Sequence, residues 1–316
     1  MLTFIQSPAP ANFAAPATTD RSALFADWLS FVDVSANTAA TYARQIRVFA
    51  DFCNAREIAT PTRETLIDYR AELLATGKQS STAAVYFGAA KMFVRFLESK
   101  GIVPAESSRV KAPKISREHK RDAFSPAQIR EILAGTENAR DKALIALAAT
   151  TGLREFSLVD ATIADLRNDA LAGCVLFFRS KGKTEKADFV RVPAAVEKLL
   201  RAYLATRGNV PETAPLFASE APRNRGEKLT TFSVSRLCKN AFRRAGICSR
   251  RLTAHSLRHT AATVALASGE KIEAVADMLA HRNIQTTLIY AHRIARAQST
   301  AENSVAAAIF GAPSAA

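Results

Sequence analysis

The chain has 316 residues, of which 48% are hydrophobic and 23% are charged. This ordinary globular composition excludes a wholly disordered chain, a collagen and a coiled-coil rod, and the length favours two domains. Lysine and arginine number 43 against 29 aspartates and glutamates, which gives a formal net charge of +14 at pH 7. Such an excess indicates a polyanionic partner, nucleic acid or an anionic membrane, unless the protein is simply basic.

Membrane spans and disulfides are not expected. No apolar stretch approaches the roughly 18–20 residues of a membrane span. Residues 1–20 are rich in Ala, Pro and Thr, lack the pattern of a signal peptide, and are predicted to be a disordered lead-in. The four cysteines show neither CxxC spacing nor a neighbouring His pair. We therefore expect free thiols in a reducing cytoplasm, and neither a metal nor a cofactor.

Residues 21–101 are predicted to form a first, entirely helical domain. Apolar residues recur there at spacings of three and four, which is typical of helices that bury one face. The predicted helices cover residues 23–32, 38–55, 62–76 and 80–100. Four helices of this length are enough for a compact bundle.

Two pairs of basic residues lie on polar faces of this predicted bundle. Arg44 comes three residues before Arg47, and Lys91 comes four before Arg95, so each pair shares one helix face. Either pair alone is more typical of a solvated surface. Together with the net charge, both become candidates for contacts to a polyanion.

Residues 102–122 are predicted to be an extended basic linker. Pro104 and Pro113 interrupt a stretch of weak apolar periodicity in which basic residues outnumber acidic ones. Such a strap suits a protein that wraps around a duplex, although a solubilising linker would have the same composition. Lys111 and Lys114 are further contact candidates.

A second domain is predicted over residues 123–293. Ser125 followed by Pro126 is typical of a helix start. The apolar runs 174–178 and 188–192 flank a polar, lysine-rich turn and predict a β-hairpin.

The most basic part of the chain, residues 223–258, and the C-terminal tail complete the sequence. Four arginines in the basic stretch are candidates for contacts to a nucleic-acid backbone: Arg243, Arg244, Arg250 and Arg251. The tail, residues 294–316, carries the apolar segment 304–310, which has little to bury against within its own domain.

Four short motifs carry residues suited to chemistry on a phosphate. They are TGLR at 151–154, SKGK at 180–183, HSLRHT at 255–260 and LAHRNIQTTLIYAH at 279–292. In this order they resemble the tyrosine recombinases, or phage integrase family, most closely its Xer-like and transposon-integrase members. The resemblance covers about residues 21–290. Each motif alone is weak, but four in the right order are specific.

The resemblance implies a mainly α fold with a small β-sheet, in which two domains clamp DNA. The first would be a helical-bundle, SAM-like core-binding domain and the second a mixed α+β catalytic domain. The implied activity is the site-specific cutting and rejoining of DNA strands through a 3′-phosphotyrosyl intermediate, independent of metal and ATP. Mobile-element integration and the resolution of chromosome dimers both fit.

The resemblance also implies partners and a location. Double-stranded DNA with specific recombination sites is the expected partner, and no membrane. A homotetramer on two DNA sites is expected to exchange C-terminal tails between subunits, with accessory proteins as further partners that the resemblance allows. The bacterial cytoplasm, at the nucleoid, is the expected location.

The expected reaction needs positive charge on one phosphate and a nucleophile beside it. Arginine stays charged and binds phosphate oxygens bidentately, so Arg154 and Arg258 are expected to stabilise the transition state. Tyr290 is the candidate nucleophile, because a phenol can form the covalent link. His281 would donate to the same phosphate.

Two residues are expected to move protons. His255 is the candidate general base for the phenol. Lys181, in the hairpin turn, would protonate the departing 5′-hydroxyl, with a pKa lowered by nearby arginines. Register with the family's GKG pattern favours Lys181 over Lys183.

The sequence departs from the family pattern at several positions. Ser157 stands where the family has an acid three residues after the first arginine, and an acid occurs instead at Glu155. Ala280 replaces a glycine, which we expect to be without consequence if the backbone there is helical. His259 is expected to pack or to hydrogen-bond locally.

Two other functions remain as hypotheses. A non-catalytic DNA-binding module with the same fold is disfavoured by the complete set of six candidate catalytic residues. A topoisomerase that uses the same chemistry at single sites is disfavoured by the N-terminal bundle and the Xer-like motifs.

Overall fold

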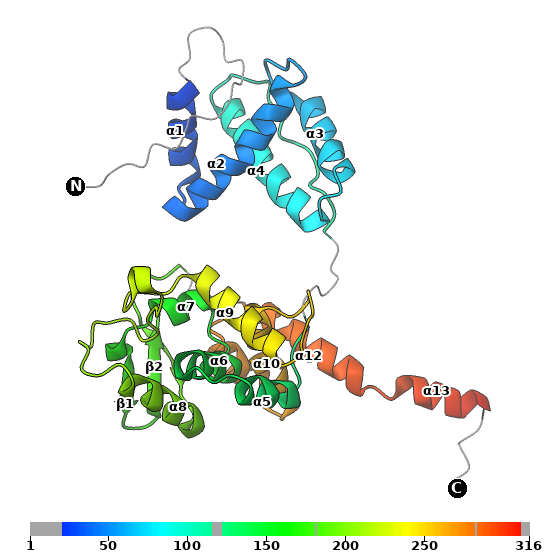
Figure 1. Ribbon diagram of the computed structural model, residues 1–316. Coiled ribbons are helices and arrows are strands. Elements are labelled where there is room, and N and C mark those ends of the chain that lie inside the picture. Colours follow the sequence, from blue (N-terminus) through cyan, green and yellow to red (C-terminus); the bar gives the residue numbers. More distant parts are fainter. Residues whose placement is uncertain (1–20, 116–121, 181, 282, 311–316) are drawn as a thin grey trace. The chain divides into compact units, whose positions relative to one another are not determined.

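The computed structural model describes residues 21–115, 122–180, 182–281 and 283–310, except for the side chains of residues 21–23, 293 and 297. The predicted lead-in, residues 1–20, lies outside the described residues. The chain divides into two compact units, Met1–Glu118 and His119–Ala316 (Figure 1).

The first unit is the predicted helical bundle. Its helices are α1 (Arg21–Val32), α2 (Ala36–Asn54), α3 (Arg63–Ala75) and α4 (Ser80–Ser99). The α4 helix packs against each of the other three. Its core is aromatic: Trp28, Phe49, Tyr69 and Phe87 are all buried. Burying such large side chains stabilises a domain of this small size.

The start of the predicted linker is folded against this bundle. Val103 and Val110 are buried in the core of the first unit. The Nζ atom of Lys91 donates to the carbonyl of Val110 at 2.8 Å, and Arg70 Nη1 donates to the carbonyl of Lys111 at 2.8 Å. These contacts attach the segment to α3 and α4, so an extended strap can only begin after Lys111.

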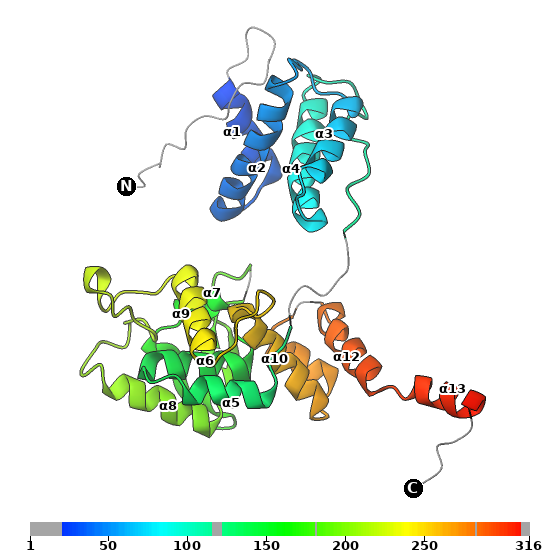
Figure 2. The same ribbon diagram turned by 45° about the vertical axis from the view of Figure 1, so that its right-hand side comes forward.

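The second unit contains the remaining helices. They are α5 (Pro126–Ala134), α6 (Ala139–Thr151), α7 (Glu155–Asp160), α8 (Ala194–Ala205), α9 (Thr231–Arg244), α10 (Ala254–Ala267), α11 (Ile272–Met278), α12 (Gln285–Gln298), α13 (Ala301–Phe310) and the short 3-10 turns η1 (Ile163–Asp165) and η2 (Pro222–Asn224). The apolar α6 is buried and lies among α8, α9 and α10 (Figure 2). As predicted, Ser125 caps α5, and its hydroxyl accepts from the backbone N–H of Gln128.

A small antiparallel sheet completes this unit, in the order β1 (Leu166–Asp169), β2 (Gly173–Phe178) and β3 (Asp188–Arg191). Leu176 of β2 lies opposite both Leu166 and Val190. The predicted hairpin of β2 and β3 is confirmed. The β1 strand was not predicted, because its sequence, LRND, is mostly exposed and has no alternating pattern.

The last helix, α13, is unlike the others. Every one of its residues is described, and none is buried. Val305, Ile309 and Phe310 expose apolar side chains. Among the described residues, no helix is both long and apolar enough to cross a membrane.

Candidate active site

The site is assembled around Arg258, which lies on α10 and is only 4% exposed. Its Nη1 donates to the carbonyl of Gly152 at 2.6 Å, and its Nη2 donates to the carbonyl of Leu279 at 2.7 Å. One guanidinium thereby joins the TGLR and LAHRN segments, which are far apart in sequence. Arginine has five N–H donors, so a guanidinium that makes these two bonds retains donors for a phosphate.

The charge of Arg258 survives its burial. Burial, followed by the positive charge of Arg154, lowers the pKa of Arg258 to about 10. The group therefore stays protonated at neutral pH. Its partners are neutral carbonyls, so its positive charge is not cancelled by a carboxylate at these contacts.

Gly152 allows the close approach on which this arrangement depends. It ends α6 with φ +66°, a left-handed conformation that favours glycine. A Cβ atom there would lie 2.4 Å from Leu279 Cδ2 and 3.3 Å from Ala261 Cβ. The chain then turns directly into α7, with Arg154 as the residue that precedes the helix.

Arg154 and Tyr290 are electrostatic neighbours. Burial lowers the pKa of Arg154, while the proximity of Tyr290 raises it. The proximity of Tyr290 also raises the pKa of Arg258. Tyr290 lies on α12, which packs against α10, and it is buried. The structure thus brings the candidate nucleophile beside both candidate phosphate-binding arginines.

His281 is held by a hydrogen bond and by its charged surroundings. Its Nδ1 lies 2.8 Å from Oγ1 of Thr287, which is fully buried. Burial, then the positive charges of Arg258 and Arg154, lower the pKa of His281 to about 4. The imidazole is therefore neutral at pH 7, with one N–H to donate. Thr287 was not predicted as a site residue, although it lies within the motif that contains both His281 and Tyr290.

A row of rings connects the candidate base to the candidate nucleophile. The His255 and His259 rings lie 5.0 Å apart, and the His259 and Tyr290 rings lie 5.2 Å apart. His259 was expected to pack locally, and its packing partner is the candidate nucleophile itself. His255 Nδ1 also lies 3.9 Å from Glu155 Oε2. Glu155, the acid that directly follows Arg154, therefore faces His255.

A pocket of about 520 Å³ opens beside these residues. Arg154, Glu155 and His255 line it, together with exposed rings of Phe156 and Phe232. A phosphodiester that entered this pocket would meet one candidate arginine and the candidate base. Lys181, the remaining candidate catalytic residue, lies outside the described residues.

Two of the departures from the family pattern acquire a structural meaning. Ser157 is buried, and its hydroxyl lies 3.5 Å from the carbonyl oxygen of Arg179, at the end of β2. Ala280 has φ +46°, so the backbone there is not helical and the condition under which its replacement of glycine was expected to be without consequence is not met. Ala280 follows the end of α11, where its N–H donates to the carbonyl of Asp277, and an L-residue is strained in that conformation.

The candidate DNA contacts lie on both units. In the first, Lys91 and Lys111 line a groove of about 610 Å³ with Arg63, Arg70 and Arg109, three arginines that were not predicted. Their common groove could not be read from sequence, because they come from α3, α4 and the folded linker. The other candidates on this unit are exposed: Arg44, Arg47, Arg95 and Lys114.

In the second unit, Arg243, Arg244 and Arg250 are exposed. Arg251 differs because its Nε atom donates to Asp122 Oδ2 at 2.9 Å. A phosphate contact by Arg251 would compete with this ion pair.

Comparisons with known proteins agree with this geometry. The model of the phage integrase family matches residues 123–296, and the model of the phage integrase N-terminal SAM-like domain matches residues 24–101. The tyrosine recombinase XerC of Pelobacter propionicus is 31% identical over 274 residues, which are 82% of this chain and 86% of that protein.

Solved structures share the fold. The Tn1549 transposon integrase in complex with a circular intermediate DNA has a TM-score of 0.68 at 16% identity, covering 85% of this chain and 93% of that one. XerH bound to a palindromic difH substrate, in a post-cleavage complex, has a TM-score of 0.64 at 19% identity, covering 89% and 84%. The chain therefore belongs to the phage integrase family. It is a tyrosine recombinase, an enzyme of site-specific DNA cleavage and rejoining.

Proposed function

We propose that Tyr290 is the nucleophile of this recombinase and that Arg154 and Arg258 hold the phosphate it attacks. The observation that carries the proposal is the position of Arg258, which joins the loops of Gly152 and Leu279 beside Tyr290. Fixed guanidinium groups stabilise the negative charge of the phosphoryl oxygens without rearranging during the reaction.

The proton transfers of the reaction are assigned to residues of the same site. The phenol oxygen of Tyr290 forms a bond to phosphorus, and its proton passes to His255. The bond from phosphorus to the 5′ oxygen breaks, and Lys181 supplies the proton of the 5′-hydroxyl. His281, neutral at pH 7, donates its N–H to a phosphoryl oxygen. Attack by a 5′-hydroxyl of another strand reverses these steps, so the phosphodiester energy is retained.

Assembly and partners form the second part of the proposal. Double-stranded DNA is bound by both units, Met1–Glu118 as the core-binding domain and His119–Ala316 as the catalytic domain. Four chains act on two DNA sites, where accessory proteins can join them. The exposed apolar side chains of α13 support an exchange of this helix between subunits, since none of its residues is buried within the described part of the chain. The bacterial cytoplasm, where such DNA is found, is the proposed location.

A nicked DNA substrate tests the proposal. Binding sites are first selected with the protein from duplexes of random sequence, and a nick then lets the short 5′-hydroxyl strand diffuse away after cleavage. We expect the wild type to form a denaturation-resistant adduct and Tyr290→Phe to bind the DNA without forming one.

Two results would support the other functions. Binding by the wild type without any adduct would indicate a non-catalytic DNA-binding module. An adduct with relaxation of supercoiled DNA, but no strand exchange between two sites, would indicate a topoisomerase.

A further inference from the structure

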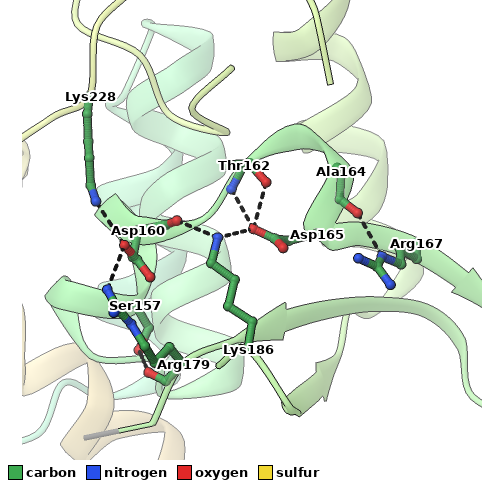
Figure 3. A network of polar contacts seen from close by, with 9 residues as sticks. All are labelled: Ser157, Asp160, Thr162, Ala164, Asp165, Arg167, Arg179, Lys186 and Lys228. Carbon is green, nitrogen blue, oxygen red and sulfur yellow. Dashed lines mark hydrogen bonds and ion pairs between the residues drawn. The ribbon is translucent and has the colours of Figure 1, made fainter. Parts of the chain in front are cut away.

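A network of charged side chains centres on Asp160, the last residue of α7, the helix that begins next to Arg154 (Figure 3). Asp160 Oδ1 accepts from Arg179 Nη2 at 3.1 Å and from Lys228 Nζ at 2.9 Å. The backbone carbonyl of Asp160 accepts from Lys186 Nζ at 2.7 Å. Lys186 also reaches Asp165 Oδ2 at 2.5 Å.

Two of these cations stand at opposite ends of one turn. Arg179 directly follows β2, and Lys186 comes two residues before β3. The turn between them carries Lys181 in its sequence. Ser157 adds a third contact, through the carbonyl oxygen of Arg179 (Figure 3). Both ends of the turn are therefore fixed to the segment that runs from α7 to η1.

The same segment begins at Arg154. The six-residue helix α7 separates Arg154, at its N-terminal boundary, from Asp160, at its C-terminal end. A single turn and a half of helix is a short and rigid spacer. The contacts that fix the turn to Asp160 therefore also fix the ends of the turn relative to Arg154, a candidate phosphate-binding residue.

Asp160 and Asp165 are ionised under working conditions. Burial raises the pKa of Asp160, but the hydrogen bond from Lys228 and the charges of Lys228, Arg179 and Lys186 outweigh it, and the pKa is lowered. Burial also raises the pKa of Asp165. The hydrogen bonds from Lys186 and Thr162 outweigh burial, and the pKa of Asp165 is lowered as well.

We propose that Asp160, assisted by Asp165, is a positioning residue that holds both ends of the lysine-bearing turn in register with Arg154, so that the proton donor reaches the 5′ oxygen of the phosphate bound there. This inference rests on the proposed role of Lys181. It assigns no contact between Asp160 and DNA. Asp160 acts only through the turn, and its loss affects the leaving group rather than the nucleophile.

A DNA substrate with sulfur in place of the bridging 5′ oxygen isolates this step. A thiolate is a far weaker base than an alkoxide and leaves without a proton donor. The substrate is the selected nicked duplex, made in oxygen and sulfur forms. For Asp160→Asn we expect cleavage of the oxygen form to slow by on the order of 10- to 100-fold, because a general acid supplies such factors and displacement removes them. The sulfur form should be cleaved at the wild-type rate.

The two cations on Asp160 Oδ1 offer a matched pair of variants. Arg179→Met removes an anchor of the turn, whereas Lys228→Met removes a partner of the same carboxylate oxygen that lies outside the turn. We expect Arg179→Met to repeat the oxygen-specific loss. Lys228→Met should stay within about threefold of wild type on both substrates, because Lys228 does not hold the turn and its side chain is half exposed. Glu197→Gln, which breaks an ion pair on α8, controls for charge removal in the same unit.

The outcomes separate this inference from the function on which it rests. Sulfur rescue of both Lys181→Ala and Asp160→Asn supports both. A second outcome is that sulfur rescues Lys181→Ala, while Asp160→Asn either slows cleavage of both substrates equally or slows neither. That outcome overturns the positioning role of Asp160 and leaves Lys181 as the proton donor. Absence of rescue for Lys181→Ala overturns both. Arg179→Met provides the same comparison should Asp160→Asn fail to fold, as judged by its thermal unfolding.

Discussion

Two regions of the second unit hold their loops with ionic side chains but give those side chains different partners. In the candidate active site, Arg258 is bonded to two neutral carbonyls and retains its positive charge. In the network centred on Asp160, the carboxylates of Asp160 and Asp165 face Arg179, Lys186 and Lys228. The first arrangement leaves the positive charge of Arg258 available for a phosphate, whereas in the second each cation is paired with a carboxylate and serves to position the loops. An arginine bonded to neutral carbonyls, such as Arg258, can still bind an anion, whereas one paired with a carboxylate, such as Arg179, has a structural role.

The first prediction concerns the close contact on which the Arg258 arrangement depends. For Gly152→Ala we expect the free energy of unfolding to fall by about 2–4 kcal/mol, because left-handed strain adds to a steric clash with Leu279. Gly208 has φ +67° with no atom near its missing Cβ, so Gly208→Ala should show the backbone effect without a clash, about 0.5–1 kcal/mol after the lower entropy of the unfolded alanine chain is included. Urea unfolding measures both. Equal losses of unfolding free energy in the two variants would show that Leu279 does not lie close to residue 152.

The two regions should also respond to acid in different pH windows. The pKa of His281 is about 4 in the folded chain, against an ordinary value of 6.5. Between these values the unfolded chain binds a proton that the folded chain does not, so stability falls as the pH drops from about 6.5 to about 4. We expect His281→Asn to lose less stability over that range in urea unfolding at a series of pH values. A curve parallel to the wild type would contradict the depressed pKa of His281.

Asp160 and Asp165 affect the stability of the folded chain at lower pH than His281 does. Their pKa values in the folded chain lie below the ordinary 3.8, so their contribution is present above about pH 4 and is lost as the pH falls further. In the same titration, Asp165→Asn should flatten the stability curve below pH 4 and leave the higher window unchanged. A change in the higher window instead would mean that the two regions are coupled.

The smallest expected effect is at Ala280, beside the active site. The left-handed backbone at Ala280 costs an L-residue about 1–2 kcal/mol. Glycine removes this strain but raises the entropy of the unfolded chain, which destabilises the folded protein by about 0.4–1 kcal/mol. We therefore expect Ala280→Gly to stabilise the protein by about 0.5–1 kcal/mol in urea unfolding. Ala202→Gly, at an exposed site within α8, should have the opposite sign. Destabilisation by both would mean that Ala280 is not strained.

The same two regions differ in how far they could be predicted from the sequence. The candidate active-site residues lie in four local motifs, so they could be proposed from the sequence alone, and the hairpin between two of these motifs was predicted as well. The contacts of Asp160 join residues 19, 26 and 68 positions apart and follow no local pattern. The left-handed backbone of Ala280 and the burial of Val110 depend on tertiary packing in the same way.

The most direct test of the central claim, that the residues gathered by Arg258 act with Tyr290 on one phosphate, is the location of the covalent bond. The adduct trapped on the selected nicked duplex is digested with protease and nuclease, and the modified peptide is sequenced by mass spectrometry. The account predicts a nucleotide joined through a 3′ phosphate to Tyr290. A nucleotide on another residue, with Tyr290 unmodified, would contradict it.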